Sequence, residues 1–91
     1  MAKLTEKQIV TALAQLDGWK RSGDSIHRTF TKPDFVQAMG LVTSVGLLAQ
    51  RVNHHPDIDI RWNKVKLTLS THSEGGLTKK DVALAKAINS L

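Results

Sequence analysis

The chain has 91 residues, the size of one small domain, and we treat residues 1–91 as a single domain with a modest core. It has no cysteine, which excludes disulfides and thiolate metal sites. We expect neither a signal segment nor an apolar run long enough to cross a bilayer. The predicted location is therefore the cytoplasm, without membrane contact. The net charge is +5, but the basic residues are scattered and no basic run alternates with aromatics, so we expect no direct nucleic acid binding.

The first helix is predicted to begin at Thr5. Thr5 and Gln8 have the spacing of a capping box, in which each side chain bonds the other residue's amide. Leu4 and Ile9 flank this pair at the spacing of a hydrophobic staple. Gly18 is a suitable left-handed stop for the helix.

A hairpin is predicted over residues 19–31. Residues 22–25, Ser-Gly-Asp-Ser, supply the turn, and Ile26 and Phe30 share one side of the strand that follows. Trp19, directly after a glycine, favours a core anchor over a ligand contact. His27 is interpreted as a solvated strand residue.

A second helix is predicted to begin at residues 31–34, where Asp34 suits the positive end of the helix dipole. Its apolar residues form two adjacent stripes: Phe35, Met39, Val42, Val45, Ala49 and Val52, then Ala38, Leu41, Val45 and Leu48. This face is wider than a sheet covers, so we expect the helix to pack on the sheet and also on another subunit. Gly40 and Gly46 would allow close approach there.

This helix is predicted to end near Asn53. Asn53 is a good left-handed terminator, and Pro56 disfavours helical geometry at His55. His54 and His55 therefore lie at the exit of a helix C-terminus, whose dipole favours a protonated imidazole.

Two further strands and a last helix complete the chain. Ile58, Ile60 and Trp62 alternate with polar residues as in a half-buried strand, residues 63–64 can turn the chain, and residues 65–69 continue the apolar face. His72 falls on the opposite parity, away from the core. Residues 73–76 form a loop, and residues 78–81 begin the last helix with an acidic third position. The order α-β-β-α-β-β-α predicts an α+β fold, an antiparallel sheet with helices on one face.

Histidines are the candidate functional residues. His54, His55 and His72 can give and take protons near neutral pH, so they can act as acid, base and orienting groups on a small organic substrate. The alternatives are a three-histidine zinc site, ordinary surface histidines, and an interaction module that uses the wide helix face. Zinc is weakly supported because no His-x-x-x-His spacing occurs, and a serine hydrolase lacks its Gly-x-Ser-x-Gly elbow.

The chain resembles the pterin-4a-carbinolamine dehydratases over nearly its whole length. The matching segments are Asn53-His54-His55-Pro56, Trp62-Asn63-Lys64-Val65, Thr68-Leu69-Ser70-Thr71-His72, Gly75-Gly76-Leu77-Thr78 and Asp81, with Gly18-Trp19 and Asp34-Phe35 upstream. The resemblance implies dehydration of 4a-hydroxytetrahydropterin to quinonoid dihydropterin, the recycling step after aromatic amino acid hydroxylation. It implies no metal or organic cofactor. It also implies a four-stranded antiparallel sheet with three helices on one side.

The resemblance further implies the site residues and the partners. His54 and His72 would be the main acid-base pair and His55 would assist, while Asp81, a helix cap on spacing alone, would also orient a catalytic group. The implied pterin-lining residues are Asn53, Pro56, Ser70, Thr71, Ser73 and Trp19. Besides the pterin substrate, we expect a homodimer or homotetramer formed through the second helix and a sheet edge.

Two positions depart from the family pattern. Gln50 stands where an acidic residue is common, and Lys80 where arginine is frequent. Loss of the acidic charge at Gln50 could alter rate or substrate preference. Animal members of the family also act as dimerisation cofactors of a transcription factor, so the alternative is a non-catalytic interaction role for the apolar face of the second helix.

Overall fold

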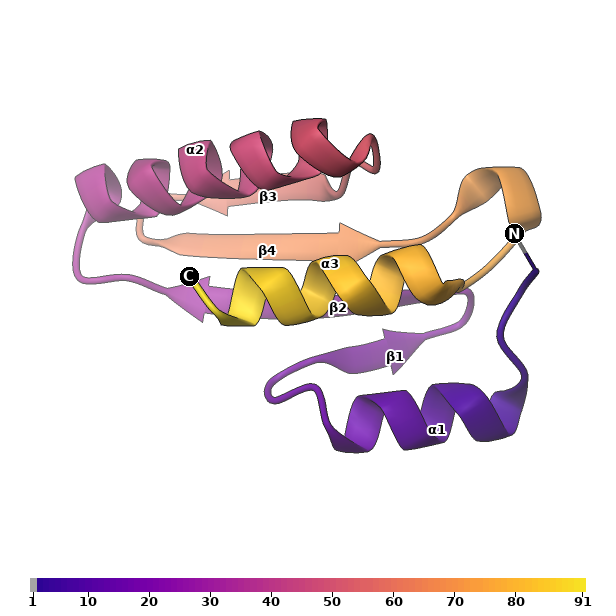
Figure 1. The fold of residues 1–91 in the computed structure, drawn as a ribbon. Coiled ribbons are helices and arrows are strands. Elements are labelled where there is room, and N and C mark those ends of the chain that lie inside the picture. Colours follow the sequence, from indigo (N-terminus) through magenta and orange to yellow (C-terminus); the bar gives the residue numbers. More distant parts are fainter. Residues whose placement is uncertain (1) are drawn as a thin grey trace.

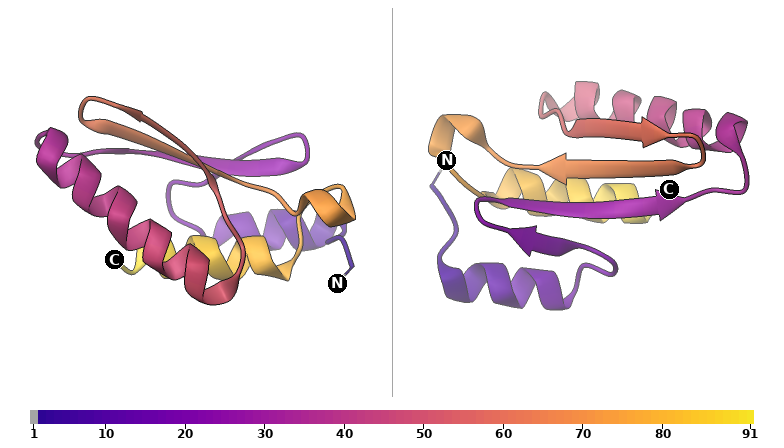
Figure 2. Two further views of the ribbon diagram at one scale, coloured as in Figure 1. Left: turned by 90° about the horizontal axis from the view of Figure 1, so that it is seen from above. Right: turned by 180° about the vertical axis from the view of Figure 1, so that it is seen from behind.

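The computed structural model describes residues 2–91 (Figure 1). Its elements are α1 (Glu6–Ala14), β1 (Lys20–Ser22), β2 (Ser25–Thr31), α2 (Phe35–Val52), β3 (Asp57–Arg61), β4 (Lys64–Leu69), a short 3-10 turn η1 (His72–Glu74) and α3 (Lys79–Asn89). The strands form one antiparallel sheet in the order β1-β2-β4-β3. All three helices lie on one face of it (Figure 2), which confirms the predicted α+β fold.

The core lies between the sheet and the helices. β4 contributes Val65, Leu67 and Leu69, all fully buried, and its neighbour β2 adds Ile26. Each such side chain stabilises the fold by about 1.5–3 kcal/mol through burial. α3 covers the central strands, while α2 lies toward the β3 edge and α1 toward the β1 edge (Figures 1 and 2). The end of β4 and the start of α3 thereby lie at the same end of the molecule (Figure 1).

α1 begins as predicted and ends earlier than predicted. The Thr5 side chain accepts from the Gln8 amide at 3.2 Å, and the Gln8 side chain accepts from the Thr5 amide at 2.9 Å. The helix ends at Ala14, because the amides of Gln15 and the next residue turn to carbonyls three residues back. Gly18, with φ +81°, serves the following turn into β1 and not the helix itself.

α2 packs one face on the core and leaves the other exposed. Asp34 is its N-cap and accepts from the Gln37 amide at 2.8 Å. The buried side chains are Ala38, Val45 and Ala49, so the core face takes members of both predicted stripes. The exposed apolar side chains are Phe35, Val36, Met39, Leu47 and Val52. By length and composition alone, α2 is long and apolar enough to cross a bilayer. This corrects the expectation that no apolar run in the chain is long enough to do so. The core face of α2 nevertheless packs within the fold.

β3 is less buried than its alternation predicted. It is an edge strand, and Ile58 is 40% exposed. Trp62 does not belong to the strand: it lies in the hairpin turn with φ +50° and 70% of its surface exposed. The turn therefore begins one residue before the predicted Asn63-Lys64 pair. Asn63 anchors it through hydrogen bonds with the backbone of Lys32 at 2.8 and 3.0 Å.

Candidate active site

The site forms where the end of α2, the end of β4 and the start of α3 meet. Asn53 ends α2 in the left-handed conformation, φ 52°, as predicted. The amide of His54 then bonds the carbonyl of Ala49 at 3.1 Å, which completes the helix C-terminus and fixes the direction of the chain. The His54 side chain consequently points at the first turn of α3.

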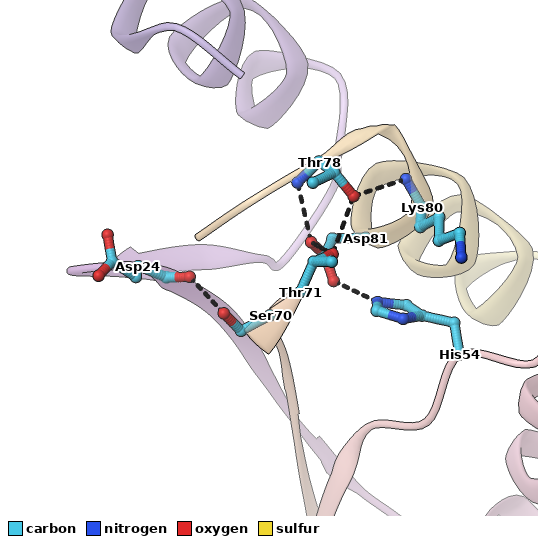
Figure 3. A network of polar contacts seen from close by, with 7 residues as sticks. All are labelled: Asp24, His54, Ser70, Thr71, Thr78, Lys80 and Asp81. Carbon is cyan, nitrogen blue, oxygen red and sulfur yellow. Dashed lines mark hydrogen bonds and ion pairs between the residues drawn. The ribbon is translucent and has the colours of Figure 1, made fainter. Parts of the chain in front are cut away.

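His54 meets Asp81 there. His54 Nε2 lies 2.5 Å from Asp81 Oδ1, and the two side chains are 11% and 0% exposed (Figure 3). A carboxylate only accepts hydrogen bonds, so His54 Nε2 donates. Nδ1 of His54 is therefore the ring nitrogen left to bind another group, as a base when neutral and an acid when protonated.

The second oxygen of Asp81 is held by two donors. Asp81 Oδ2 accepts from the Thr78 amide at 2.9 Å and from the Thr71 hydroxyl at 2.8 Å. The Thr71 and Thr78 hydroxyls lie 2.8 Å apart, and Thr78 Oγ1 accepts from the Lys80 amide at 3.3 Å. Asp81 is thus the predicted helix cap and also orients His54. Among residues 2–91 no buried side-chain nitrogen or oxygen lacks a partner.

A mostly apolar cavity of about 150 Å³ adjoins His54 between α2 and α3. Its lining residues are Leu48, Val52, His54, Lys80, Ala83, Leu84 and Ala87. An apolar site with a few polar groups at one side is typical of small-molecule binding.

The other two histidines lie at the surface. His55 is exposed, and its Nε2 lies 3.0 Å from Gln50 Oε1. His72, also exposed, is the first residue of η1 and directly follows Thr71. No group of three or more His, Cys, Asp or Glu within residues 2–91 is placed to hold a metal ion. The structure brings His54 and Asp81 together. His55 directly follows His54 in the chain, and His72 directly follows Thr71, whose hydroxyl bonds Asp81.

Apart from Thr71, whose hydroxyl bonds Asp81, the predicted pterin-lining residues fall in two groups. Asn53, Pro56, Ser70 and Ser73 lie on the segments that carry the histidines, although the Ser70 hydroxyl bonds the Asp24 carbonyl at 2.7 Å. Trp19 is in the core, where its indole donates to Asn89 at 2.9 Å. Asn89 and Asp81 are eight residues apart on α3, about 12 Å along the axis, so the geometry favours the core-anchor interpretation of Trp19.

Sequence reasoning missed Thr78 as a member of the site. Thr78 is fully buried, and its hydroxyl links Thr71 to the start of α3. The Thr78–Asp81 capping box was visible as a local pattern. A further signal was the pair of threonines on either side of Gly75-Gly76, since a short glycine-containing loop can bring Thr71 and Thr78 together. Backbone hydrogen bonds between Thr71 and Gly76, at 2.9 and 3.3 Å, close this loop.

Known proteins are similar to this chain in sequence and in fold. A protein from Mycobacteroides abscessus, provisionally named a pterin-4-alpha-carbinolamine dehydratase, is 53% identical over 98% of this chain and 95% of its own. A crystal structure from Brucella melitensis, of a transcriptional coactivator/pterin dehydratase, has a TM-score of 0.93 and 38% identity over 97% of this chain and 96% of that one.

A more distant structure shares the fold alone. A pterin dehydratase-like protein identified as a RuBisCO assembly factor in the alpha-carboxysome has a TM-score of 0.66 at 16% identity, over 79% of this chain and 83% of its own.

The sequence profile of the family described as pterin 4 alpha carbinolamine dehydratase matches residues 2–91. Together with the full-length relatives, this match means that the chain belongs to the pterin 4 alpha carbinolamine dehydratase family.

Proposed function

We propose that this protein dehydrates 4a-hydroxytetrahydropterin to quinonoid dihydropterin and water by histidine acid-base catalysis. The observation that carries the proposal is the His54–Asp81 pair, which fixes an imidazole with Nδ1 free in a chain that matches the dehydratase family from end to end. A carboxylate-held histidine is a recurrent general acid or base.

The reaction moves protons and breaks one bond. The substrate carries a hydroxyl on carbon C4a, next to nitrogen N5. One group protonates the hydroxyl as the C4a–O bond breaks, and a second accepts the N5 proton as the C4a=N5 bond forms. The products are water and the quinonoid dihydropterin, so no cofactor is needed.

We assign these two roles to His54 and His72. His72 directly follows Thr71, whose hydroxyl bonds Asp81, so His72 is next in the chain to a residue that holds the His54 partner. His55 assists by binding the pterin, with its ring held by Gln50. Asn53, Pro56, Ser70 and Ser73 are the adjacent segments available to line the ring. An amide at Gln50 keeps the hydrogen-bond acceptor of an acidic residue and loses its charge, so we expect His55 to stay oriented.

We further propose that the protein associates through α2. The exposed side of α2 carries Phe35, Met39 and Leu47. Within α2, no charged residue precedes Arg51. A side chain on Gly40 or Gly46 would meet nothing within 4 Å, so a second helix can approach closely. Among residues 2–91 the outer edge of β3 pairs with no other strand, which suits the predicted sheet-edge contact.

The exposed α2 face also supports the alternative, a non-catalytic interaction role. Leu47→Glu places a charge on this face and is expected to convert an oligomer to monomers in size-exclusion chromatography with light scattering. Val10→Glu, an equally exposed apolar position on α1, is the matched control and should leave the oligomer unchanged. An unchanged oligomer in Leu47→Glu would refute the α2 interface.

The dehydratase assignment is tested by following absorbance after fresh 4a-hydroxytetrahydropterin is generated. We expect wild type to accelerate its decay, His54→Ala and His72→Ala to lose the acceleration by about 100-fold or more, and His27→Ala, on β2, to retain it. A folded wild type that gives no acceleration would refute the enzyme and favour the interaction role.

A further inference from the structure

We propose that Thr71 is a positioning residue: through its hydroxyl it holds Asp81, and thereby the His54 ring, and it does not bind the substrate. The inference deepens the proposed function and depends on it only where catalysis is the readout. It stands on the Thr71–Thr78–Asp81 contacts at the base of η1 (Figure 3).

The direction of each hydrogen bond in this group follows from its members. Asp81 accepts only, so the Thr71 hydroxyl must donate its single proton to Oδ2. The proton between Thr71 and Thr78 must then come from Thr78. Thr78 Oγ1 in turn accepts from the Lys80 amide. The donors run in one direction, from the amide of Lys80 through two hydroxyls to the carboxylate.

This order leaves Thr71 no hydrogen-bonding proton for a ligand. Its side chain gives that proton to Asp81 and accepts from Thr78, and the residue is only 7% exposed. A pterin contact in which this hydroxyl donates would require the bond to Asp81 to break. One acceptor lone pair of the hydroxyl remains, on a side chain that is almost fully buried. The role expected from the family resemblance, pterin lining, is therefore better assigned to the exposed neighbours of Thr71.

The consequence for His54 is geometric. Two donors on Oδ2 hold the carboxylate plane, so Oδ1 stays 2.5 Å from His54 Nε2. Hydrogen bonds in a buried chain also strengthen one another. If the Thr71 hydroxyl is removed, Oδ2 keeps only the Thr78 amide, the carboxylate can turn, and the Nε2 proton of His54 is held less tightly.

The test compares Thr71→Val, which keeps the shape and loses the hydroxyl, with Thr71→Ser, which keeps the hydroxyl. In the histidine-15N-labelled full chain we expect wild type to carry the His54 proton on Nε2, with a resonance protected from solvent exchange. Thr71→Val should lose this resonance to exchange and Thr71→Ser should restore it. In the dehydration assay, Thr71→Val should lower kcat about tenfold with KM within twofold, and Thr71→Ser should recover it.

Several results would overturn the inference. These are a wild-type His54 protonated on Nδ1 and not on Nε2, a Thr71→Val resonance like that of wild type, or a Thr71→Val variant whose KM rises while kcat is unchanged, as for a substrate contact. If Thr71→Val does not fold, Thr71→Ala carries the same comparison. Should wild type fail to accelerate dehydration, the proposed function fails, while the resonance comparison still decides the role of Thr71.

Discussion

Replacing Asp81 by asparagine keeps its shape and removes the charge at the centre of the buried group. The new amide nitrogen cannot face the Thr78 amide, because two donors would meet, so it must take the place of Oδ1 and point at His54. His54 Nε2 then has to accept, and the ring proton moves to Nδ1. Nδ1, the nitrogen left for catalysis, then carries the only proton of a neutral ring. It cannot accept a proton, and it could release one only by leaving an imidazole anion.

The size of the effect on stability follows from the two hydrogen bonds that Asp81 Oδ2 accepts, from Thr71 and from Thr78. Hydrogen bonds to a charged group contribute about 1.5–3 kcal/mol and neutral ones about 0.5–1.5, so the Thr71 and Thr78 bonds together weaken by about 2 kcal/mol. For a domain of this size that lowers Tm by about 8–16 °C. Losing a correctly protonated acid-base group should lower kcat about 100-fold or more.

The measurements are thermal unfolding and the dehydration assay, with Asp59→Asn as the control. Asp59 is exposed on β3, so the same charge change there should alter stability by no more than about 0.5 kcal/mol. If Asp81→Asn kept the wild-type kcat, or unfolded at the same temperature as Asp59→Asn, the assignment of Asp81 as the group that orients His54 would be wrong.

Two further predictions concern stability away from the site. Gly18→Ala should lower the free energy of unfolding by about 2–3 kcal/mol in urea titrations, against about 1 kcal/mol for Gly23→Ala. Both glycines have positive φ, but only at Gly18 would a Cβ meet another side chain, 2.5 Å from Nε of Arg28. Arg28 cannot move away freely, because its guanidinium donates to the Asp17 carbonyl and to Asn89. Arg21 lowers the pKa of the Glu6 carboxyl, so this pair stabilises the fold above about pH 4.3 and ceases to do so as the pH falls through the lowered folded-state pKa. Glu6→Gln should therefore lower Tm at neutral pH and not at acid pH; an equal decrease at both would contradict this.

The sequence predicted the parts of the fold that are set by local hydrogen bonding. The capping boxes at Thr5 and Thr78 and the left-handed end at Asn53 involve residues a few positions apart, and all three are present. The alternation of residues 65–69 likewise predicted β4, because period-two burial needs only one covered face.

The remainder depends on contacts between distant segments. The strand order β1-β2-β4-β3 makes β3 an edge, so its apolar residues are less buried than their pattern predicted. The two stripes of α2 were visible, but which side meets the core depends on how the helix is rotated on the sheet. For the same reason, the contact of His54 with Asp81, 27 residues away, could be inferred only from the family resemblance.

The loop between Thr71 and Gly76 links local opening to the His54 site. Two backbone hydrogen bonds between Thr71 and Gly76 close the base of this loop, and the Thr71 side chain also holds Asp81. Breaking these two backbone bonds would withdraw the Thr71 hydroxyl from Asp81 and move His72 at the same time. The loop and the site therefore form one cooperative unit of native-state fluctuation, and the amides of Thr71 and Gly76 should exchange hydrogen together, at a rate that also sets how often the site is disassembled.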